Sequence, residues 1–281
     1  MPSPTGPQGL ARQTLAALRT NRPLGGLGRA LRGGRGLVSI HIPKCGGTSV
    51  ERGLRRAYPL GRRLIGPEAS YEAARTLLGL GDAEDDRHRA LMRASEMRRD
   101  LLHYHLAEGA TLVTGHAPLG PHTAEAYGAS HAFVTVMRSP GERMLSHLAF
   151  NKTEQAGHGR SELSVAQFLE TPRAQVLGAL YVKYLAGLPM SADFTTQAAI
   201  DAARRTVDRL DLVGFTDEMD AFAEGLEALT GRRFAFGHAN RGTGARLPEA
   251  AADRARSLCA PDEAVYAHAR ERFGERRAEA R

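Results

Sequence analysis

The stretch HIPKCGGTS, residues 41–49, directly follows the apolar run LVSI of residues 37–40. This pattern predicts a strand that ends in a glycine turn and opens into a helix near Thr48. Because Gly46 and Gly47 lack a Cβ and can adopt positive φ, the backbone can turn sharply there and direct its N–H groups at an anion. The start of the helix adds further N–H groups and the positive end of its dipole. The stretch therefore predicts a turn that binds phosphate or sulfate.

Side chains of the same turn complete this anion site. Lys44 supplies a full positive charge, and Thr48 and Ser49 supply hydroxyl donors. The loop of nucleotide triphosphatases reads GxxxxGK[ST], with the lysine after the last glycine, and that pattern is absent from the chain. Here the lysine precedes the glycines. The residues expected to bind the anion are Lys44, Cys45, Gly46, Gly47, Thr48 and Ser49.

A second anion site is expected further along the chain. The run HAFVTVM (131–137) predicts a strand, and RSPGERMLSHLAF (138–150) follows it. Arg138 stands at the strand end, Pro140 suits the first position of a helix, and Ser146 comes two helical turns later. The arginine can bind phosphate oxygens in a fork while the serine donates from the side. Taken alone, the arginine could equally be a solvated charge at a helix end.

The sequence PKCGGTS after a strand resembles the 5′-phosphosulfate loop of sulfotransferases that use 3′-phosphoadenosine 5′-phosphosulfate (PAPS). The resemblance is to the carbohydrate type, related to heparan sulfate 2-O-sulfotransferase. The family's 3′-phosphate motif is matched by Arg138, Pro140, Arg143 and Ser146. Weaker matches follow in the family's order at residues 111–116, 212–219 and 238–246. The resemblance spans about residues 36–247.

This resemblance implies PAPS as the cofactor and a role for the matched residues. Lys44 would stabilise the charge that grows on the leaving phosphate. His116, at the end of the stretch TLVTGH, would accept the proton of the acceptor hydroxyl. Arg241 and Gly242 would belong to a basic glycine loop that closes over the cofactor.

The chain also departs from the family's pattern at three positions. Cys45 stands where relatives usually have threonine, Ser139 replaces a common aspartate, and His147 stands where an aromatic residue is frequent. Two interpretations of Cys45 remain open. It is either a small residue that fills a tight turn or a thiol whose thiolate is favoured by Lys44 and the helix N-terminus.

The positive charge is concentrated in the first 36 residues. The chain has 281 residues and a formal net charge of +7, and the tail carries six arginines and no acidic residue. The rest is therefore nearly neutral, which argues against a nucleic-acid partner. We expect a disordered basic tail at residues 1–36 and one sulfotransferase domain at residues 37–281. A transit peptide or a membrane-surface segment is the alternative for the tail.

Cysteine usage and hydropathy bear on the compartment. The chain has only two cysteines, Cys45 and Cys259, far apart in the sequence, which favours a reducing, cytoplasmic compartment. No apolar run is long enough to predict a membrane span. The pair His103 and His105 has the wrong spacing for one helix face and no clear third ligand, so no metal site is expected.

Strands alternate with helical patterns, which predicts an α/β fold: a P-loop-like three-layer sandwich with a central parallel sheet flanked by helices. Ligands bind at the carboxyl ends of such strands, where Lys44, His116 and Arg138 are expected. An inserted segment from about Tyr71 to Glu108 and helices between residues 167 and 190 are expected to shape the acceptor pocket.

The predicted function is sulfuryl transfer from PAPS to a hydroxyl of a carbohydrate or small metabolite, by in-line displacement with a histidine base and without a metal. The product nucleotide is 3′-phosphoadenosine 5′-phosphate (PAP). Two alternatives stay open. One is a P-loop nucleotide kinase, disfavoured because the GK[ST] sequence is missing. The other is a non-catalytic nucleotide- or glycan-binding module, which would have no use for a base at His116.

Overall fold

A computed structural model describes residues 34–153, 157, 159–236 and 248–274. Most of the basic tail and the predicted loop residues Arg241 and Gly242 lie outside the described residues. The first strand begins at Gly36, close to the expected start of the domain.

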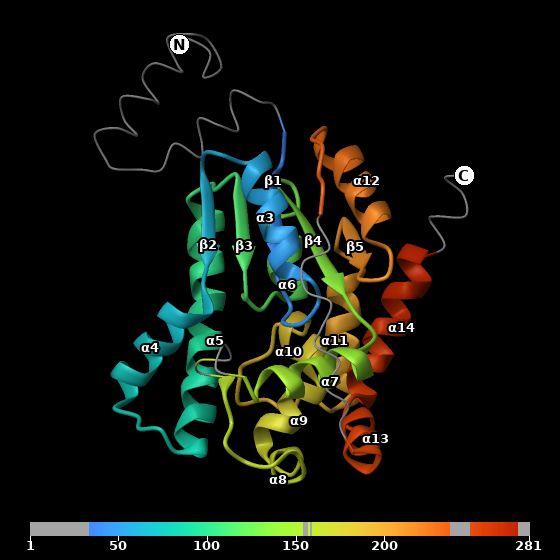
Figure 1. Ribbon diagram of the computed structural model, residues 1–281. Coiled ribbons are helices and arrows are strands. Elements are labelled where there is room, and N and C mark those ends of the chain that lie inside the picture. The colour runs from blue at the N-terminus through green and yellow to red at the C-terminus, as the bar shows by residue number, and fades with distance from the viewer. Residues whose placement is uncertain (1–33, 154–156, 158, 237–247, 275–281) are drawn as a thin grey trace, which may run out of the picture.

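The centre of the fold is a sheet of five parallel strands in the order β2-β3-β1-β4-β5 (Figure 1). The strands are β2 (Arg62–Ile65), β3 (Leu112–Gly115), β1 (Gly36–Ile40), β4 (His131–Met137) and β5 (Leu212–Phe215). In the register, Val38 of β1 lies between Val113 of β3 and Phe133 of β4. The parallel sheet predicted from the alternating elements is confirmed.

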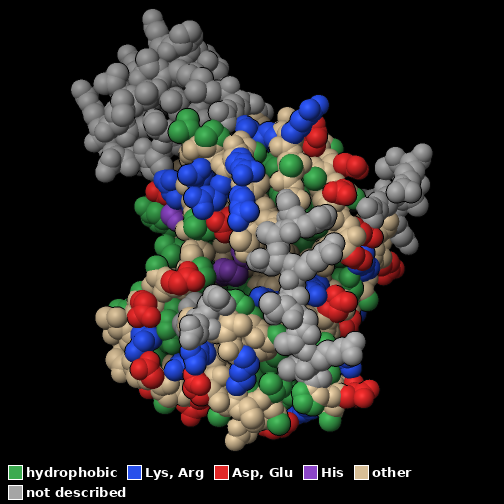
Figure 2. Space-filling view, in the orientation of Figure 1, with side chains coloured by type: hydrophobic (Ala, Val, Ile, Leu, Met, Phe, Trp, Pro, Cys, Tyr) green, Lys and Arg blue, Asp and Glu red, His purple; other side chains and the backbone are tan. Residues whose placement is uncertain are grey.

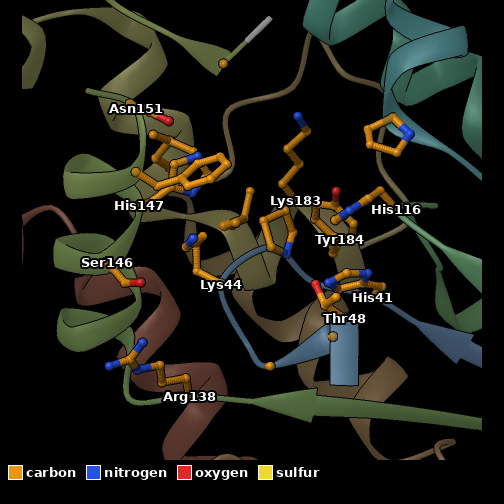
Figure 3. A pocket seen from close by; sticks show the side chains of 18 of the residues that line it. His41, Lys44, Thr48, His116, Arg138, Ser146, His147, Asn151, Lys183 and Tyr184 are labelled. Atoms are coloured by element: carbon orange, nitrogen blue, oxygen red, sulfur yellow. The ribbon is translucent and has the colours of Figure 1, made fainter. Parts of the chain in front are cut away.

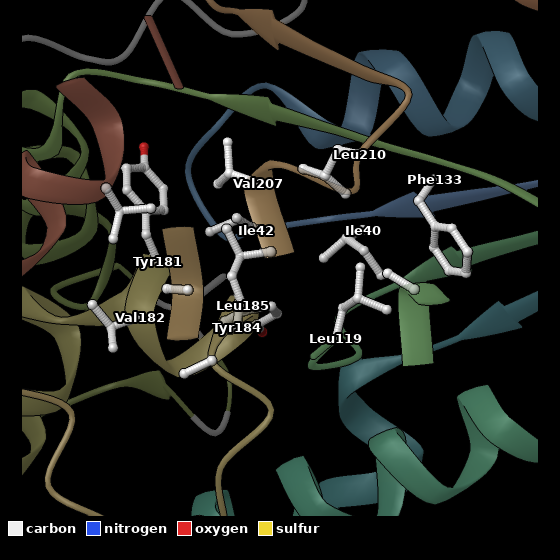
Figure 4. Packing of buried hydrophobic residues seen from close by; sticks show 14 of the residues in the cluster. Ile40, Ile42, Leu119, Phe133, Tyr181, Val182, Tyr184, Leu185, Val207 and Leu210 are labelled. Carbon is white, nitrogen blue, oxygen red and sulfur yellow. The ribbon is translucent and has the colours of Figure 1, made fainter. Parts of the chain in front are cut away.

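Helices cover both faces of this sheet because its strands alternate apolar side chains between the faces. Leu37 packs with the first face, covered by α3 (Gly47–Ala57) and α12 (Met219–Thr230). Val38 and Ile40 pack on the opposite face, and Figure 4 shows Ile40 and Phe133 in the cluster with Leu185 and Val207. The helices on that face are α5 (Glu84–Ala107), α6 (Pro121–Tyr127), α10 (Leu180–Leu185), α11 (Gln197–Val207) and α14 (Ala260–Gly274). The fold is thus an α/β three-layer sandwich, as predicted.

A further group of helices lies beyond the carboxyl ends of the strands, in the lower half of Figure 1. These helices are α4 (Pro67–Leu78), α7 (Pro140–Phe150), α8 (Val165–Leu169), α9 (Pro172–Gly178) and α13 (Glu249–Ser257). Four of them share a separate small core that includes Met144, Phe168 and Ala255. They form the wall opposite the sheet edge at which ligands were expected.

A buried ion pair fixes α7 and α10 beside this edge. The Arg143 guanidinium donates to Asp262 of α14 at 3.0 Å, and both side chains are fully buried. Asp262 also accepts from the backbone N–H groups of Tyr181 and Val182, at 2.8 and 3.2 Å. Arg143, part of the matched phosphate motif, is therefore a structural residue that holds the helices carrying the site.

Two parts of the fold differ from the prediction or go beyond it. The helices expected between residues 167 and 190 include α9 and α10, which are separated at Ala179, whose ψ of 36° departs from helical geometry. Strand β2 was not predicted, because Arg62 and Leu64 are exposed on an edge strand and only Ile65 is buried. The inserted segment expected from about Tyr71 to Glu108 contains most of α4 and the long helix α5.

Candidate functional site

A cavity of about 870 Å³ opens at the carboxyl ends of β1, β3 and β4. Figure 2 shows the hollow in the middle of this face, with histidine side chains inside it. Eight of the predicted site residues line the cavity: Lys44, Gly46, Gly47, Thr48, Ser49, His116, Arg138 and Ser146. The structure therefore brings together residues that the sequence separates by about a hundred positions.

The turn after β1 joins the strand to α3 through two residues with positive φ. Lys44 has a φ of 66° and Gly46 a φ of 74°, both in the left-handed region. Gly46 caps α3, so the N–H groups of Gly47 and Thr48 lie in the first turn and have no acceptor within the helix. Such alternation of backbone conformation turns successive N–H groups toward one point. Of the two glycines, only Gly46 uses positive φ; the second unusual residue is Lys44.

Gly47 is needed for a different reason, namely the space occupied by His41. A Cβ placed on Gly47 would lie 1.8 Å from Nε2 of His41, well inside van der Waals contact. The His41 ring in turn stacks on the ring of His116, with centroids 4.2 Å apart and planes 28° apart. Burial lowers the pKa of His41 to about 4, so this imidazole is neutral near pH 7. The turn and the predicted base are thus packed together through His41.

Lys44 lies against an aromatic ring on the facing helix. Its Nζ is 3.9 Å from the centroid of Phe150 of α7, a cation–π contact. Burial and the charge of Arg138 lower the pKa of Lys44 from its ordinary value. No carboxylate of the described residues forms an ion pair with Lys44. Its charge therefore remains available to an anion bound in the turn.

Helix α7 forms the opposite wall with Arg138, Ser146 and His147 (Figure 3). The backbone of Arg138 is held by the Tyr181 hydroxyl, which accepts from its N–H at 2.8 Å and donates to its carbonyl. Within the described part of the chain, the Arg138 side chain makes one ion pair, with the exposed Glu142 at 3.3 Å. Nδ1 of His147 is buried without a hydrogen-bond partner among the described residues. Burial and nearby cations lower the pKa of His147 to about 3, which makes it neutral.

Cys45 does not line the cavity. Its side chain is 1% exposed and its Sγ lies 3.5 Å from the Tyr181 hydroxyl in the core. Burial raises the pKa of the Cys45 thiol, so the alternative of a favoured thiolate is wrong. Any contact of Cys45 with an anion would have to come from its backbone.

The other histidines considered from the sequence lie outside the cavity. His103 shares a hydrogen bond with Thr123 at 3.0 Å, and His105 shares one with Glu108 at 3.0 Å. Within the described part of the chain, no cluster of three or more His, Cys, Asp or Glu side chains has a geometry that could hold a metal. No helix in that part combines the length and apolar character required to cross a bilayer.

Sequence reasoning missed several residues of the cavity: His41, Arg98, Phe150, Lys183 and Tyr184. His41 opens the very stretch that predicted the turn and could have been identified as a second strand-end histidine. Lys183 interrupts the apolar segment LYVKYL, and a lysine in a buried apolar helix is itself an indication of a site. Arg98 and Phe150 carry no comparable indication in their local sequence.

No protein-family model and no curated protein sequence matches the chain. Among solved structures, the chain is similar to a sulfotransferase from Alicyclobacillus acidocaldarius, with 14% identity over 85% of this chain and 96% of that one and a TM-score of 0.43. It is also similar to a structure described as the PezAT chromosomal toxin-antitoxin system of Streptococcus pneumoniae, with 9% identity, 95% and 98% coverage and a TM-score of 0.35. At these identities and TM-scores, neither likeness assigns a function to the chain.

Proposed function

We propose that the protein is a sulfotransferase that moves a sulfuryl group from PAPS to an acceptor hydroxyl, and that the acceptor is a carbohydrate or a small metabolite. The observation that supports the proposal is that two separate groups of basic and hydroxyl-bearing residues line one cavity. One is the turn with Lys44 after β1, and the other is the pair Arg138 and Ser146 at β4 and α7. PAPS carries anionic groups at both its 5′ and 3′ positions and would use both.

The turn suits the 5′-phosphosulfate. N–H groups of the first turn of α3 would bind the phosphate oxygens, with Lys44 as the charged partner and the Thr48 hydroxyl beside it. Arg138 and Ser146 would then bind the 3′-phosphate. Met219 and Phe236 also line the cavity and offer apolar surface to the adenine.

The reaction would be an in-line displacement at sulfur. The acceptor oxygen forms a bond to sulfur while the bond from sulfur to the bridging phosphate oxygen breaks, and PAP leaves. Negative charge grows on the leaving phosphate, where Lys44 and the helix-terminal N–H groups stabilise it. Lys44 has no acidic partner among the described residues, so the leaving phosphate would be its counter-charge.

The acceptor proton would go to His116. This residue follows β3, lines the cavity and is stacked on His41. Since the ring of His41 is buried and neutral, it fixes the position of His116 without adding a repelling charge. This stacking would hold the His116 ring at the cavity wall.

Binding and turnover together test the proposal. Thermal shifts and calorimetry with PAP, 5′-AMP and ATP should rank PAP first, because a bound ligand stabilises the fold by mass action. Transfer of label from sulfur-labelled PAPS to a panel of hydroxyl compounds should then identify the acceptor. Stronger binding of ATP than of PAP would favour a P-loop kinase, and binding of PAP without transfer to any acceptor would favour a non-catalytic module.

A further inference from the structure

The cavity extends beyond the turn into an inner half lined by α5 and α10. Residues of this inner half are Leu91, Met92, Arg98, Leu180, Lys183 and Tyr184. They belong to the two segments expected from the sequence to shape the acceptor pocket. The inner half combines an apolar wall with two basic side chains.

Lys183 is the charged residue of α10. The other five side chains of this helix are buried and hydrophobic, and Lys183 itself is only 6% exposed. Figure 3 shows its side chain in the cavity, with Lys44 and His147 on one side in this view and His41 and His116 on the other. The small exposed fraction is therefore exposure to the cavity.

The ammonium group of Lys183 lacks a counter-charge among the described residues. Its Nζ forms no hydrogen bond or ion pair with any of them. The charge that acts on it is that of Arg98 on α5, and Lys183 in turn acts on His88 of α5 and His147 of α7. Among the described residues, the charged groups that interact with Lys183 are thus basic, and the neighbouring Tyr184 is neutral because burial raises its pKa to about 12.

Arg98 is similarly short of acidic partners. It is 5% exposed, and it donates to the Ser70 hydroxyl at 2.6 Å and to the Pro67 carbonyl at 3.0 Å. It also interacts with the Tyr184 hydroxyl, which stays neutral because burial raises its pKa to about 12. Glu68 is the carboxylate whose charge acts on Arg98, but it is exposed and forms no ion pair with it among the described residues. By contrast, the nearby buried Arg173 has Glu84 at 2.6 Å.

A buried cation without a partner is costly, and it is relieved either by loss of the proton or by an anion. Burial and the charge of Arg98 lower the pKa of Lys183 to about 7, so in the free protein the proton is easily lost. An oxyanion in the inner half would supply the missing counter-charge to both Lys183 and Arg98. A neutral ligand would supply no counter-charge to these two cations.

We propose that the inner half binds an oxyanion carried by the acceptor, held by Lys183 and Arg98, while the uncharged body of the acceptor contacts Leu91 and Met92. The acceptor is then a hydroxylated anion bearing a carboxylate, sulfate ester or phosphate ester. That this molecule is the acceptor rests on the proposed sulfuryl transfer; the oxyanion site itself does not.

Matched probes test this site in the full-length protein. Calorimetric titration at pH 6.5 compares 4-hydroxybenzoate with its neutral amide, 4-hydroxybenzamide, without PAP and with PAP at saturating concentration. We expect the carboxylate to bind at least about tenfold more tightly, as a charged hydrogen bond predicts. Phenyl sulfate and phenyl phosphate, compared in the same way, identify which oxyanion the site prefers.

Three variants test whether the preference for the carboxylate over the amide depends on Lys183. Lys183→Gln should abolish it and leave PAP affinity unchanged, whereas Lys183→Arg should keep most of it. Arg89→Gln, which removes a positive charge from an exposed side chain outside the cavity, should have no effect. Equal binding of the two probes to the parent would overturn the proposal. So would a Lys183→Arg variant that binds the carboxylate as weakly as Lys183→Gln does, because that result would indicate that Lys183 acts as an uncharged base.

The pH dependence gives an independent readout. The preference for the carboxylate should fall between pH 6.5 and 8.5 as Lys183 loses its proton, and it should stay constant in Lys183→Arg. His88 and His147 do not produce this change, because both have a lowered pKa and are mostly neutral over this range. A constant preference in the parent would exclude Lys183 as the binding group.

Failure of the two proposals can be told apart. If PAP does not bind but 4-hydroxybenzoate binding depends on Lys183, the oxyanion site stands and sulfuryl transfer fails. If PAP binds and the two probes bind equally, sulfuryl transfer stands and only the oxyanion site is lost.

Discussion

The rings of His41 and His116 stack with centroids 4.2 Å apart, although the two residues follow different strands. This contact links the turn that is predicted to bind the anion to the predicted base. Replacement of His116 by alanine should lower kcat by roughly 10²–10⁴-fold, the usual contribution of a general base, and leave PAP affinity near that of the parent. His103→Ala, at a histidine outside the cavity, is the control and should keep full activity. A fully active His116→Ala variant would assign the proton to another group.

Lys44 should act mainly on the chemical step. Lys44→Ala removes the charge that would face the leaving phosphate in the proposed reaction, and kcat should fall by about 10²–10³-fold. Phe150→Leu keeps the lysine but removes the ring 3.9 Å from its Nζ, so the loss should be much smaller. Steady-state kinetics with labelled PAPS measures both. If the two variants were equally slow, the position of the lysine would matter more than its charge.

Much of the fold was predictable because its inner strands carry continuous apolar runs that end in polar or glycine turns. Val38 and Phe133 belong to such runs, and both lie in the centre of the sheet. Strand β2 carries no such run, since an edge strand leaves Arg62 and Leu64 exposed. The carboxyl ends of parallel strands lie at the same edge of a sheet. Lys44, His116 and Arg138, which follow three such strands, could therefore be expected to lie close together.

The inner half of the cavity could not be predicted in the same way. Arg98 and Lys183 lie on different helices, and only the packing of α5 and α10 onto one face of the sheet brings them together. For Cys45, the position in the sequence was predictable but the direction of the side chain was not. It lies within the predicted turn, but its side chain turns into the core toward Tyr181, and nothing in the local sequence decides between the two directions.

Gly47 should tolerate no side chain while His41 is present. A Cβ there would lie 1.8 Å from the His41 ring, so Gly47→Ala should destabilise the fold by about 1–3 kcal/mol through overpacking. The double variant His41→Ala, Gly47→Ala should recover part of this loss because the ring is gone. Urea unfolding measures the free energy of unfolding of the parent, of Gly47→Ala and of the double variant.

Gly141 of α7 provides the matched control for Gly47. A Cβ on Gly141 would have its nearest neighbour at 3.4 Å, at the flexible side chain of Arg256. Gly141→Ala should therefore be neutral or slightly stabilising, as expected for alanine in a helix. A Gly47→Ala variant as stable as Gly141→Ala would show that the His41 ring moves aside at little cost.

Stability should fall in mild acid because two histidines are buried in the neutral form. Burial lowers the pKa of His41 to about 4 and that of His147 to about 3, from an ordinary 6.5. Below pH 6.5 the unfolded chain binds protons that the folded protein does not, so stability is present above that pH and is lost as pH falls toward 4. His147→Leu should flatten this dependence in urea unfolding at pH 5 and 7.5. An unchanged slope would mean that His147 is protonated in the fold.

Arg138 and Ser146 should decide which nucleotide binds, because only a 3′-phosphate would reach them. In the parent, PAP should bind clearly more tightly than 5′-AMP. Arg138→Ala should remove most of the difference, about 1.5–3 kcal/mol for a charged hydrogen bond, and Ser146→Ala a smaller part, about 0.5–1.5 kcal/mol. Calorimetric titration of both nucleotides into each variant measures how much each side chain contributes to the preference for PAP over 5′-AMP.

Two further variants separate the side chain of Arg138 from its surroundings. Glu142→Gln breaks the exposed ion pair at 3.3 Å and should leave the preference for PAP unchanged or slightly larger, since the guanidinium is then freer to bind phosphate. Tyr181→Phe removes the hydroxyl that accepts from the Arg138 N–H at 2.8 Å, so it should weaken PAP more than 5′-AMP by misplacing the arginine. Equal affinity of the parent for PAP and 5′-AMP would contradict the 3′-phosphate site, whatever the variants do. A preference that survives Arg138→Ala would move that site to residues elsewhere on the cavity wall.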